Sequence, residues 1–410
     1  MFSVEGLFGR AQMNKQVIAL VIIVIIGFSG FVFGAYYLSM QQFGLPQPTD
    51  SPVNPSSQPT TVPVAGNVLR YKTASFIDSQ GIGTKAFSLL IPSDWQFEGS
   101  VVWNLDNTLM PATANIRAWN PNSNEEFDIF PNQAFYWTDN PLVQQTNPPG
   151  STYFGATVSA PLGPIEALKE VVIPKFRSNV ENLNVVSEQL LPSMDQLFKT
   201  GTDPTSGMSY SVNSGKIRAE YSLNGVVMED ELYCVIQSIN IPLQSIYGTT
   251  TSNNWYMSYL ASFRAEKGQL ASESELFQTI AYSCAIDKNW LNKYNQLVAY
   301  LIQNQIRQIQ SAGQLSQILA QTSDQISQEN LQDWEQRQNV NDQLVTDFCN
   351  QILEIQPYNN PIDGTTVNLP SGYSNAWVNG NGEYILANNL DFNPNIGSTL
   401  NWQPMTTTGG

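Results

Sequence analysis

Two short acidic clusters contain the residues of this chain best suited to acid–base chemistry. They are Glu125, Glu126 and Asp128 in the first cluster, and Glu229, Asp230 and Glu231 in the second. Paired carboxylates hydrolyse glycosides when they face each other across a cleft at roughly 5 to 9.5 Å. Neighbouring residues of a strand point to opposite faces, so neither cluster supplies such a pair by itself. We expect both clusters to be solvated acidic edges that discourage strand-to-strand aggregation.

Other catalytic and metal-binding arrangements are missing from the sequence. Histidine is absent, which removes the usual general base, the commonest zinc ligand and every Ser-His or Cys-His nucleophile pair. There is no P-loop, no SxxK motif and no GxGxxG between a strand and a helix. The Asp-Gly and Asn-Gly runs near Asp363 and Asn379 lack the calcium-loop spacing and fit turns. The sequence therefore predicts no metal, no cofactor and no recognisable enzyme.

Aromatic side chains gather between residues 101 and 138, interleaved with asparagine and proline. Trp103, Trp119, Tyr136 and Trp137 are candidates for a ligand surface, because glycans and peptides pack on aromatic rings flanked by amides and carboxylates. The alternative is that the same rings fill the core of a strand-rich domain.

The charge balance limits the class of partner. The formal charge is −16, from 18 basic and 34 acidic residues, and a nucleic-acid partner would require a basic footprint. An acidic surface suits a soluble body outside the cell. Three cysteines, Cys234, Cys284 and Cys349, fit either one disulfide with a free thiol or three buried thiols.

A membrane segment is predicted near the N-terminus, within residues 16–39. Residues 17–38 carry no charge, and a helix of that length spans about 30 Å, the thickness of a bilayer core. Arg10 and Lys15 precede the segment, which places residues 1–15 in the cytosol and the body outside. A cleaved signal peptide is the alternative, although the apolar run is longer than usual. The Pro- and Ser-rich residues 40–66 form a spacer.

Gly30 and Gly34 have the GxxxG spacing at which two membrane helices approach closely. They are therefore the candidate contacts of a homo-oligomer. Glycine is common in membrane helices, so a chance occurrence is the alternative.

Residues 67–286 are expected to form a mixed domain of helices and strands. Strand-like alternation recurs along this region, and a helix is predicted to begin at Pro164. Asn224 and Gly225 separate two long strand-like runs, which predicts a hairpin with a type I′ turn. The order of FSLLIPSDW, a central helix, a late hairpin and LFQTIAYS resembles the PsbP-like superfamily. That resemblance implies an α/β/α sandwich around an antiparallel sheet, and it implies no common catalytic site.

Residues 287–356 are rich in glutamine and predict a long helical hairpin. Leu291, Tyr294, Val298 and Leu301 follow the spacing of a helix face, and a second arm is expected through Trp334. An intermolecular coiled coil is the alternative. It would make the chain an assembly subunit that associates through this segment.

Residues 357–410 are expected to form a small β-rich tail with a hairpin around the NGNG sequence at 379–382. The order LPSGY, GEYI and TLNWQP also resembles a WW domain, a three-stranded sheet that grips proline-rich peptides. That resemblance implies peptide contacts at Tyr384 and Trp402. A tyrosine, Tyr373, occupies the place of the first tryptophan, and a purely structural module is the alternative.

Together these patterns predict an α+β protein with a membrane helix, a sandwich domain, a helical hairpin and a small β tail. The expected function is that of a non-enzymatic binding or scaffold protein of the cell envelope. Its partner would be another envelope protein or a surface polymer. A glycan-directed hydrolase with carboxylates drawn from separate strands is the alternative.

Overall fold

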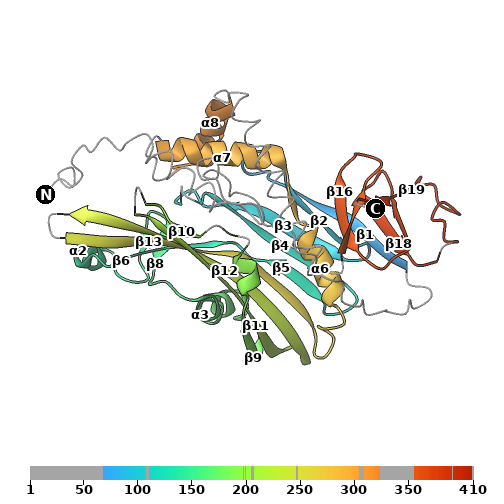
Figure 1. Ribbon diagram of the computed structural model, residues 1–410, viewed down its shortest axis with the longest axis horizontal. Coiled ribbons are helices and arrows are strands. Elements are labelled where there is room, and N and C mark those ends of the chain that lie inside the picture. Colours follow the sequence, from blue (N-terminus) through green and yellow to red (C-terminus); the bar gives the residue numbers. More distant parts are fainter. Residues whose placement is uncertain are drawn as a thin grey trace, which may run out of the picture.

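The computed structural model describes residues 68–107, 110–196, 198, 200–204, 207–245, 248–303, 309–323, 355–389 and 391–408. These residues form mainly β-structure in three sheets, with short helices at their faces and ends (Figure 1). The predicted α/β/α sandwich is therefore wrong. Three strands of 15, 20 and 19 residues dominate this region and its helices are short, so sheet takes the place of the helical layers that the resemblance implied.

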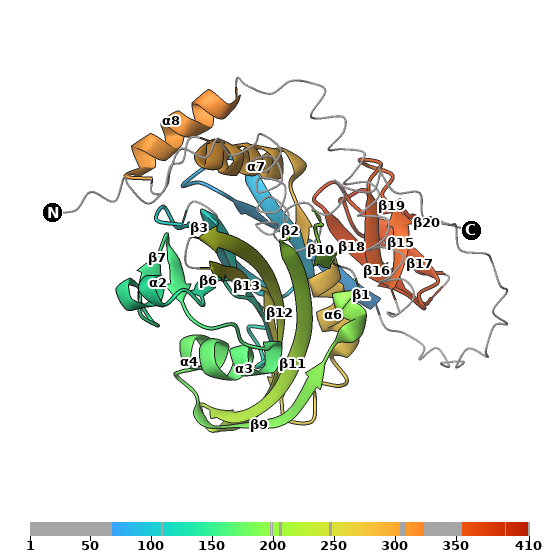
Figure 2. The same cartoon turned by 60° about the vertical axis from the view of Figure 1, so that its left-hand side comes forward.

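Those three long strands are the centre of an eleven-stranded sheet. They are β11 (Ser209–Leu223), β12 (Val226–Ser245) and β13 (Gly248–Glu266), and each pairs antiparallel with the next. Asn224 and Gly225 join the first two with φ angles of 52° and 83°, as the predicted type I′ turn requires. Figure 2 shows the long strands curving around the helical segment that contains α3 and α4.

Shorter strands extend this sheet on both sides. On one side of β13 lie β5 (Glu126–Ile129), β4 (Ala112–Trp119) and β3 (Gln96–Trp103), and on the other side of β11 lie β9 (Glu181–Leu190) and β10 (Gly201–Thr202). The remaining members are β6 (Gln133–Thr138), β7 (Thr152–Tyr153) and β8 (Ala156–Val158), where β6 pairs with β13. The strand-like alternation noted along residues 67–286 is confirmed between residues 96 and 138.

A second sheet joins the two ends of the described chain. Its order is β14 (Ala285–Ile286), β2 (Lys85–Pro92), β1 (Val68–Ile77), β18 (Glu383–Ala387), β17 (Asn375–Val378) and β19 (Gln403–Pro404). The hairpin predicted around residues 379–382 is confirmed, because β17 and β18 pair across it. Strand β18 also pairs with β1, with Val68 opposite Ala387. A third sheet contains β16 (Thr366–Pro370), β15 (Ile355–Asn359) and β20 (Thr406–Thr407).

Most helices of the described ranges cover sheet faces, and none of them pairs as a long hairpin. The segment from α3 (Pro164–Ala167) through the π-helical η2 (Leu168–Val172) to α4 (Ile173–Phe176) buries Ile165 and Leu168 against β11 and β12. Helices α2 (Pro141–Thr146) and α5 (Pro192–Asp195) are short. Helix α6 (Ser274–Tyr282) shares a core with the first two strands and with β3, β4 and β5.

The helices described after residue 287 correct the predicted hairpin. They are α7 (Lys288–Gln303) and the shorter α8 (Ala312–Ser323), which lies beside it (Figure 1). Leu291, Tyr294 and Val298 do share one face, but that face packs into the main core instead of against a second long arm. Helical spacing indicates that one face of a helix is buried but not which element covers that face. The prediction of a long hairpin was wrong for this reason. The expected second arm through Trp334 lies outside the described residues.

Asp78 fixes the start of α7 to the sheets. Its Oδ1 accepts hydrogen bonds from the Trp103 indole and from the Gly81 backbone, both at 2.9 Å. Its Oδ2 accepts from the Trp290 indole and the Ile82 backbone, also at 2.9 Å. This buried carboxylate therefore joins the end of β1, the end of β3 and α7 at one point.

The predictions for the N-terminal region fall on residues that the structure does not describe. These are the cytosolic tail 1–15, the membrane segment 16–39 with Gly30 and Gly34, and the spacer 40–66. None of the helices in the described ranges combines the length and the apolar character needed to cross a bilayer.

Candidate functional site

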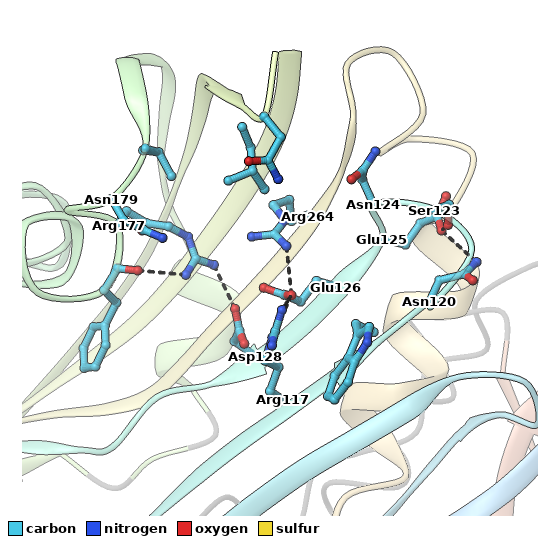
Figure 3. A pocket seen from close by; sticks show the side chains of 15 residues that line it. Arg117, Asn120, Ser123, Asn124, Glu125, Glu126, Asp128, Arg177, Asn179 and Arg264 are labelled. Atoms are coloured by element: carbon cyan, nitrogen blue, oxygen red, sulfur yellow. Dashed lines mark hydrogen bonds and ion pairs between the residues drawn. The ribbon is translucent and has the colours of Figure 1, made fainter. Parts of the chain in front are cut away.

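A polar cleft of about 520 Å³ opens where several parts of the large sheet meet. Three arginines and three carboxylates line it, together with asparagines and the rings of Trp119 and Phe176. The charged residues are Arg117, Arg177, Arg264, Glu125, Glu126 and Asp128. We call this site the arginine–carboxylate cleft (Figure 3).

Strand register brings these side chains together. Glu126 and Asp128 are two residues apart on β5 and therefore point to the same face. Arg117 on β4 lies opposite Asp128, and Arg264 on β13 lies opposite Glu126. Arg177 follows the last turn of α4 and reaches the same face from the helical side. The cleft therefore rests on rigid strands.

Glu126 lies between two guanidinium groups (Figure 3). Its Oε2 accepts hydrogen bonds from Arg117 Nε at 2.8 Å and Nη2 at 2.6 Å, and it forms an ion pair with Arg264 Nη2 at 2.8 Å. Arg117 also contacts Glu98 at 3.4 Å and stacks over the Trp119 ring, 4.7 Å from its centroid. These contacts hold the Trp119 ring at the cleft.

Arg177 pairs with two carboxylates at the base of the cleft. It donates from Nη2 to Asp128 Oδ2 at 2.9 Å and from Nε to Asp230 Oδ2 at 2.6 Å. Asp230 is fully buried and also accepts from the Tyr221 hydroxyl at 2.9 Å and the Ser262 hydroxyl at 2.5 Å. Every group in this buried network has charged or hydroxyl partners, as buried charges require.

Burial changes the proton affinity of this network. Burial raises the pKa of Asp128 to about 7, with Arg177 acting in the opposite direction and Glu126 adding to the rise. Burial alone would lower the pKa of Arg177, but the charges of Asp230 and Asp128 outweigh it and raise that pKa. Arg177 therefore stays charged while Asp128 titrates near neutral pH.

The two acidic clusters are not solvated edges, so that prediction is wrong. Glu126, Asp128, Asp230 and Glu231 are all buried. Asp230 and Glu231 point to opposite faces of β12, and Glu231 pairs with Lys216 at 2.5 Å and with Arg218 at 2.8 Å. The first cluster lines the cleft, and Asp230 of the second cluster accepts a hydrogen bond from Arg177 at the base of the cleft. The partner arginines were absent from the prediction because cross-strand neighbours are set by register.

Only one of the four predicted aromatic residues lies at the cleft. Trp119 lines it, whereas Trp103 is at the other end of the same β3–β4 hairpin, roughly 23 Å away along the strands. Tyr136 stacks on Tyr153 with ring centroids 4.3 Å apart, on β6. Trp137 follows it and points to the opposite strand face. The four rings therefore do not form one surface.

The two predicted peptide contacts of the tail are buried. Tyr384 lies opposite Tyr71 in the β1–β18 pairing and packs in a core that includes both. Trp402 is buried as well, and its backbone N–H donates to Asn395 Oδ1 at 2.7 Å. Neither ring is placed to grip a peptide from outside.

No group of three or more acidic or cysteine side chains suited to a metal occurs within the described ranges. Cys234 and Cys284 are free thiols, and burial raises the pKa of Cys284 to about 12. Cys349 lies outside the described residues.

Comparison with known proteins identifies no family for this chain. No family model and no curated protein sequence matches it. Among solved structures, the chain is similar to LpqN, a protein involved in cell envelope biogenesis of Mycobacterium tuberculosis, at 11% identity. The match covers 53% of this chain and 91% of LpqN, with a TM-score of 0.19, and at that score it carries no argument about fold or function.

Proposed function

We propose that this chain is a non-catalytic binding protein whose site is the arginine–carboxylate cleft, and that its ligand is a saccharide of a surface polymer. The observation that carries the proposal is the lining itself. Carboxylates, guanidiniums and asparagine amides surround one half-buried indole, Trp119, which Arg117 covers on one face. Sugars combine hydroxyl groups, which need such polar partners, with C–H faces that pack on aromatic rings.

The ion pairs support binding rather than catalysis. Glu126 is paired with Arg117 and Arg264, and Asp128 is paired with Arg177. A carboxylate held by a guanidinium is a weaker nucleophile than a free one. These pairs instead fix the positions of the side chains around the cleft.

The proposal includes the location of the protein, anchored in a membrane with its folded body outside the cytosol. The uncharged segment within residues 16–39 predicts an anchor with the body outside the cytosol. A surface polymer would then be within reach of the cleft. Alkaline extraction of membranes followed by protease treatment of intact cells tests the placement, and protection of the body would contradict it.

Substitution of Trp119 tests the proposed site. Full-length protein is screened against an array of surface oligosaccharides, and the Trp119→Ala variant is compared with wild type. We expect the variant to lose at least about fivefold in affinity, because stacking of a ligand on an aromatic ring contributes about 1–3 kcal/mol.

Trp137→Ala is the matched control, since Trp137 is also half-buried on a strand of the large sheet but does not line the cleft. It should bind like wild type. Equal affinity of wild type and Trp119→Ala would refute the site, and no binding by the wild type would refute the function.

A glycan-directed hydrolase is the second candidate, favoured by one observation. Asp128 has a pKa of about 7 and lies two residues from Glu126 on the same cleft wall, so its carboxyl group carries a transferable proton at neutral pH. Incubation with the bound oligosaccharides separates the candidates. Cleavage that is abolished in Asp128→Asn would establish the enzyme, whereas unchanged oligosaccharide would support the binding protein.

A further inference from the structure

Two carboxylate oxygens at the cleft have no hydrogen-bond partner among the described residues. All ion-pair contacts of Glu126 end on Oε2, which leaves Oε1 free. The contact of Arg177 with Asp128 ends on Oδ2, which leaves Oδ1 free. Both residues line the cavity and share one face of β5. Above about pH 7, where Asp128 is ionised, the cleft therefore offers two fixed hydrogen-bond acceptors.

One arginine donor at the same place is also unpartnered within the described ranges. Arg264 Nη2 forms an ion pair with Glu126, but its Nε is buried without any hydrogen-bond partner. The side chain is only 12% exposed. A buried donor without a partner costs about 1–3 kcal/mol, so an acceptor supplied by a ligand would be favoured there.

These free groups distinguish three classes of ligand. A carboxylate or sulfate accepts hydrogen bonds only, and it would lie against the free oxygens of Glu126 and Asp128. An ammonium group donates only, and it would leave Arg264 Nε unsatisfied while facing three guanidiniums. A hydroxyl group donates and accepts, so one or two hydroxyls satisfy both kinds of free group.

We infer that the arginine–carboxylate cleft selects neutral, polyhydroxylated saccharides and rejects acidic ones, despite its three arginines. This inference rests on the proposed function and adds the charge class of the ligand. Glu126 is the specificity-determining residue, because it occupies the guanidinium groups of Arg117 and Arg264 that would otherwise bind an anion. Like-charge contact with an acidic ligand adds to the discrimination.

Matched oligosaccharides test the inference with the full-length protein. The probes are pentasaccharides of one linkage whose rings are neutral hexoses, the corresponding uronic acids or the corresponding 2-amino sugars, and affinities are measured by calorimetry at pH 7.5. We expect the neutral series to bind at least about tenfold more tightly than the uronic series, and more tightly than the amino series.

Glu126→Gln should reverse this order. The substitution keeps the length of the side chain and removes the charge that occupies Arg117 and Arg264, so the uronic series should gain about tenfold and the neutral series should weaken. Glu188→Gln is the matched control, because Glu188 pairs with Lys169 on the exposed strand β9, away from the cleft. It should leave both series unchanged.

The outcomes separate the inference from the proposed function. Tighter binding of the uronic or amino series by the wild type overturns the inference while leaving a saccharide-binding protein. Binding of no series by the wild type overturns both.

If Glu126→Gln fails to fold, as judged by circular dichroism, Asp128→Asn replaces it. Asp128→Asn should weaken the neutral series, and unchanged binding would contradict the role of Oδ1.

Discussion

Arg177 is the residue on which the buried charges of the cleft depend most. It is the cation paired with both Asp128 and Asp230, and Asp230 is completely buried. The guanidinium also lies over the Phe130 ring, 5.0 Å from its centroid. Arginine suits this position because its planar fork serves two carboxylates at once.

Replacement of Arg177 by methionine is expected to cost about 3–5 kcal/mol of unfolding free energy at pH 8, because two buried carboxylates lose their cation. The cost should be smaller at pH 5, where Asp128 accepts a proton and one of the two charges disappears. Urea unfolding at both pH values measures it. An equal cost at the two pH values would show that lost packing, rather than charge, dominates.

Asp128 gives the protein a predictable dependence of stability on pH. Its folded pKa of about 7 lies above the unfolded value of about 3.9, so the folded chain binds this proton more tightly. The corresponding stabilisation is complete below about pH 4 and is lost as the pH rises through about 7. Asp128→Asn should therefore flatten the stability profile between pH 4 and 7 in urea unfolding.

Asp94→Asn is the control for this profile, because Asp94 is exposed in the turn between β2 and β3. It should keep the wild-type slope. A slope in Asp128→Asn equal to that of the wild type would assign the pH dependence to other groups.

At the level of single residues, the sequence singled out the acidic residues of the cleft but not its arginines. The spacing of Glu126 and Asp128 places both on one face of a strand, although the prediction considered only adjacent residues and took neither cluster for a pair. Arg117 and Arg264 come from strands whose register with β5 no local pattern reveals. The acidic residues were expected at a solvated edge, but β5 is an inner strand, and arginines from β4, β13 and the end of α4 cover Glu126 and Asp128.

Among the structural elements, the junction at Asp78 connects parts of the chain that are far apart in sequence. Two indole groups, from β3 and from α7, donate to its two oxygens. Asp78→Ala should lower the unfolding free energy by about 2–5 kcal/mol, because both indole donors lose a charged acceptor in a buried place. Urea unfolding followed by tryptophan fluorescence measures the loss.

Asp78→Asn provides the graded comparison. The amide keeps one acceptor oxygen and replaces the other with a donor, so it should cost less than Asp78→Ala. An Asp78→Asn variant as stable as the wild type would show that the side-chain volume, and not the acceptor pair, holds the junction.

Elements with local signals were predicted well. The Asn224–Gly225 turn, the helix at Pro164 and the hairpin at 379–382 all follow from residues close together in sequence. The pattern at residues 287–301 correctly marked a helix with one buried face. What covers that face depends on tertiary packing: the main core covers Leu291, Tyr294 and Val298, and the shorter α8 packs near Leu301.

For the whole molecule, the pairing of β1 with β18 is the decisive feature. It makes the C-terminal tail part of the same sheet as the first strand, although the sequence suggested a separate small module. A pairing between strands at opposite ends of the chain leaves no local signature, because strand partners separated by hundreds of residues share only general alternation.

A chain that ends at Gln356 should therefore lose its native state. Removal of the tail leaves one edge of β1 unpaired and exposes the buried Tyr71. We expect the shortened protein to aggregate or to be digested rapidly in limited proteolysis, whereas a chain ending at Thr408 should resist digestion. A soluble and protease-resistant shortened protein would show that the tail is an independent module.

The same pairing sets an order of events during synthesis. Thr73 and Gly382, which are hydrogen-bonded in this sheet, are 309 residues apart. At about 5–20 residues per second, a ribosome needs roughly 15 to 60 seconds to make the partner of the first strand. During that interval one edge of β1 has no strand partner. A chain released early would therefore expose unpaired backbone N–H and C=O groups, which chaperones and proteases can recognise.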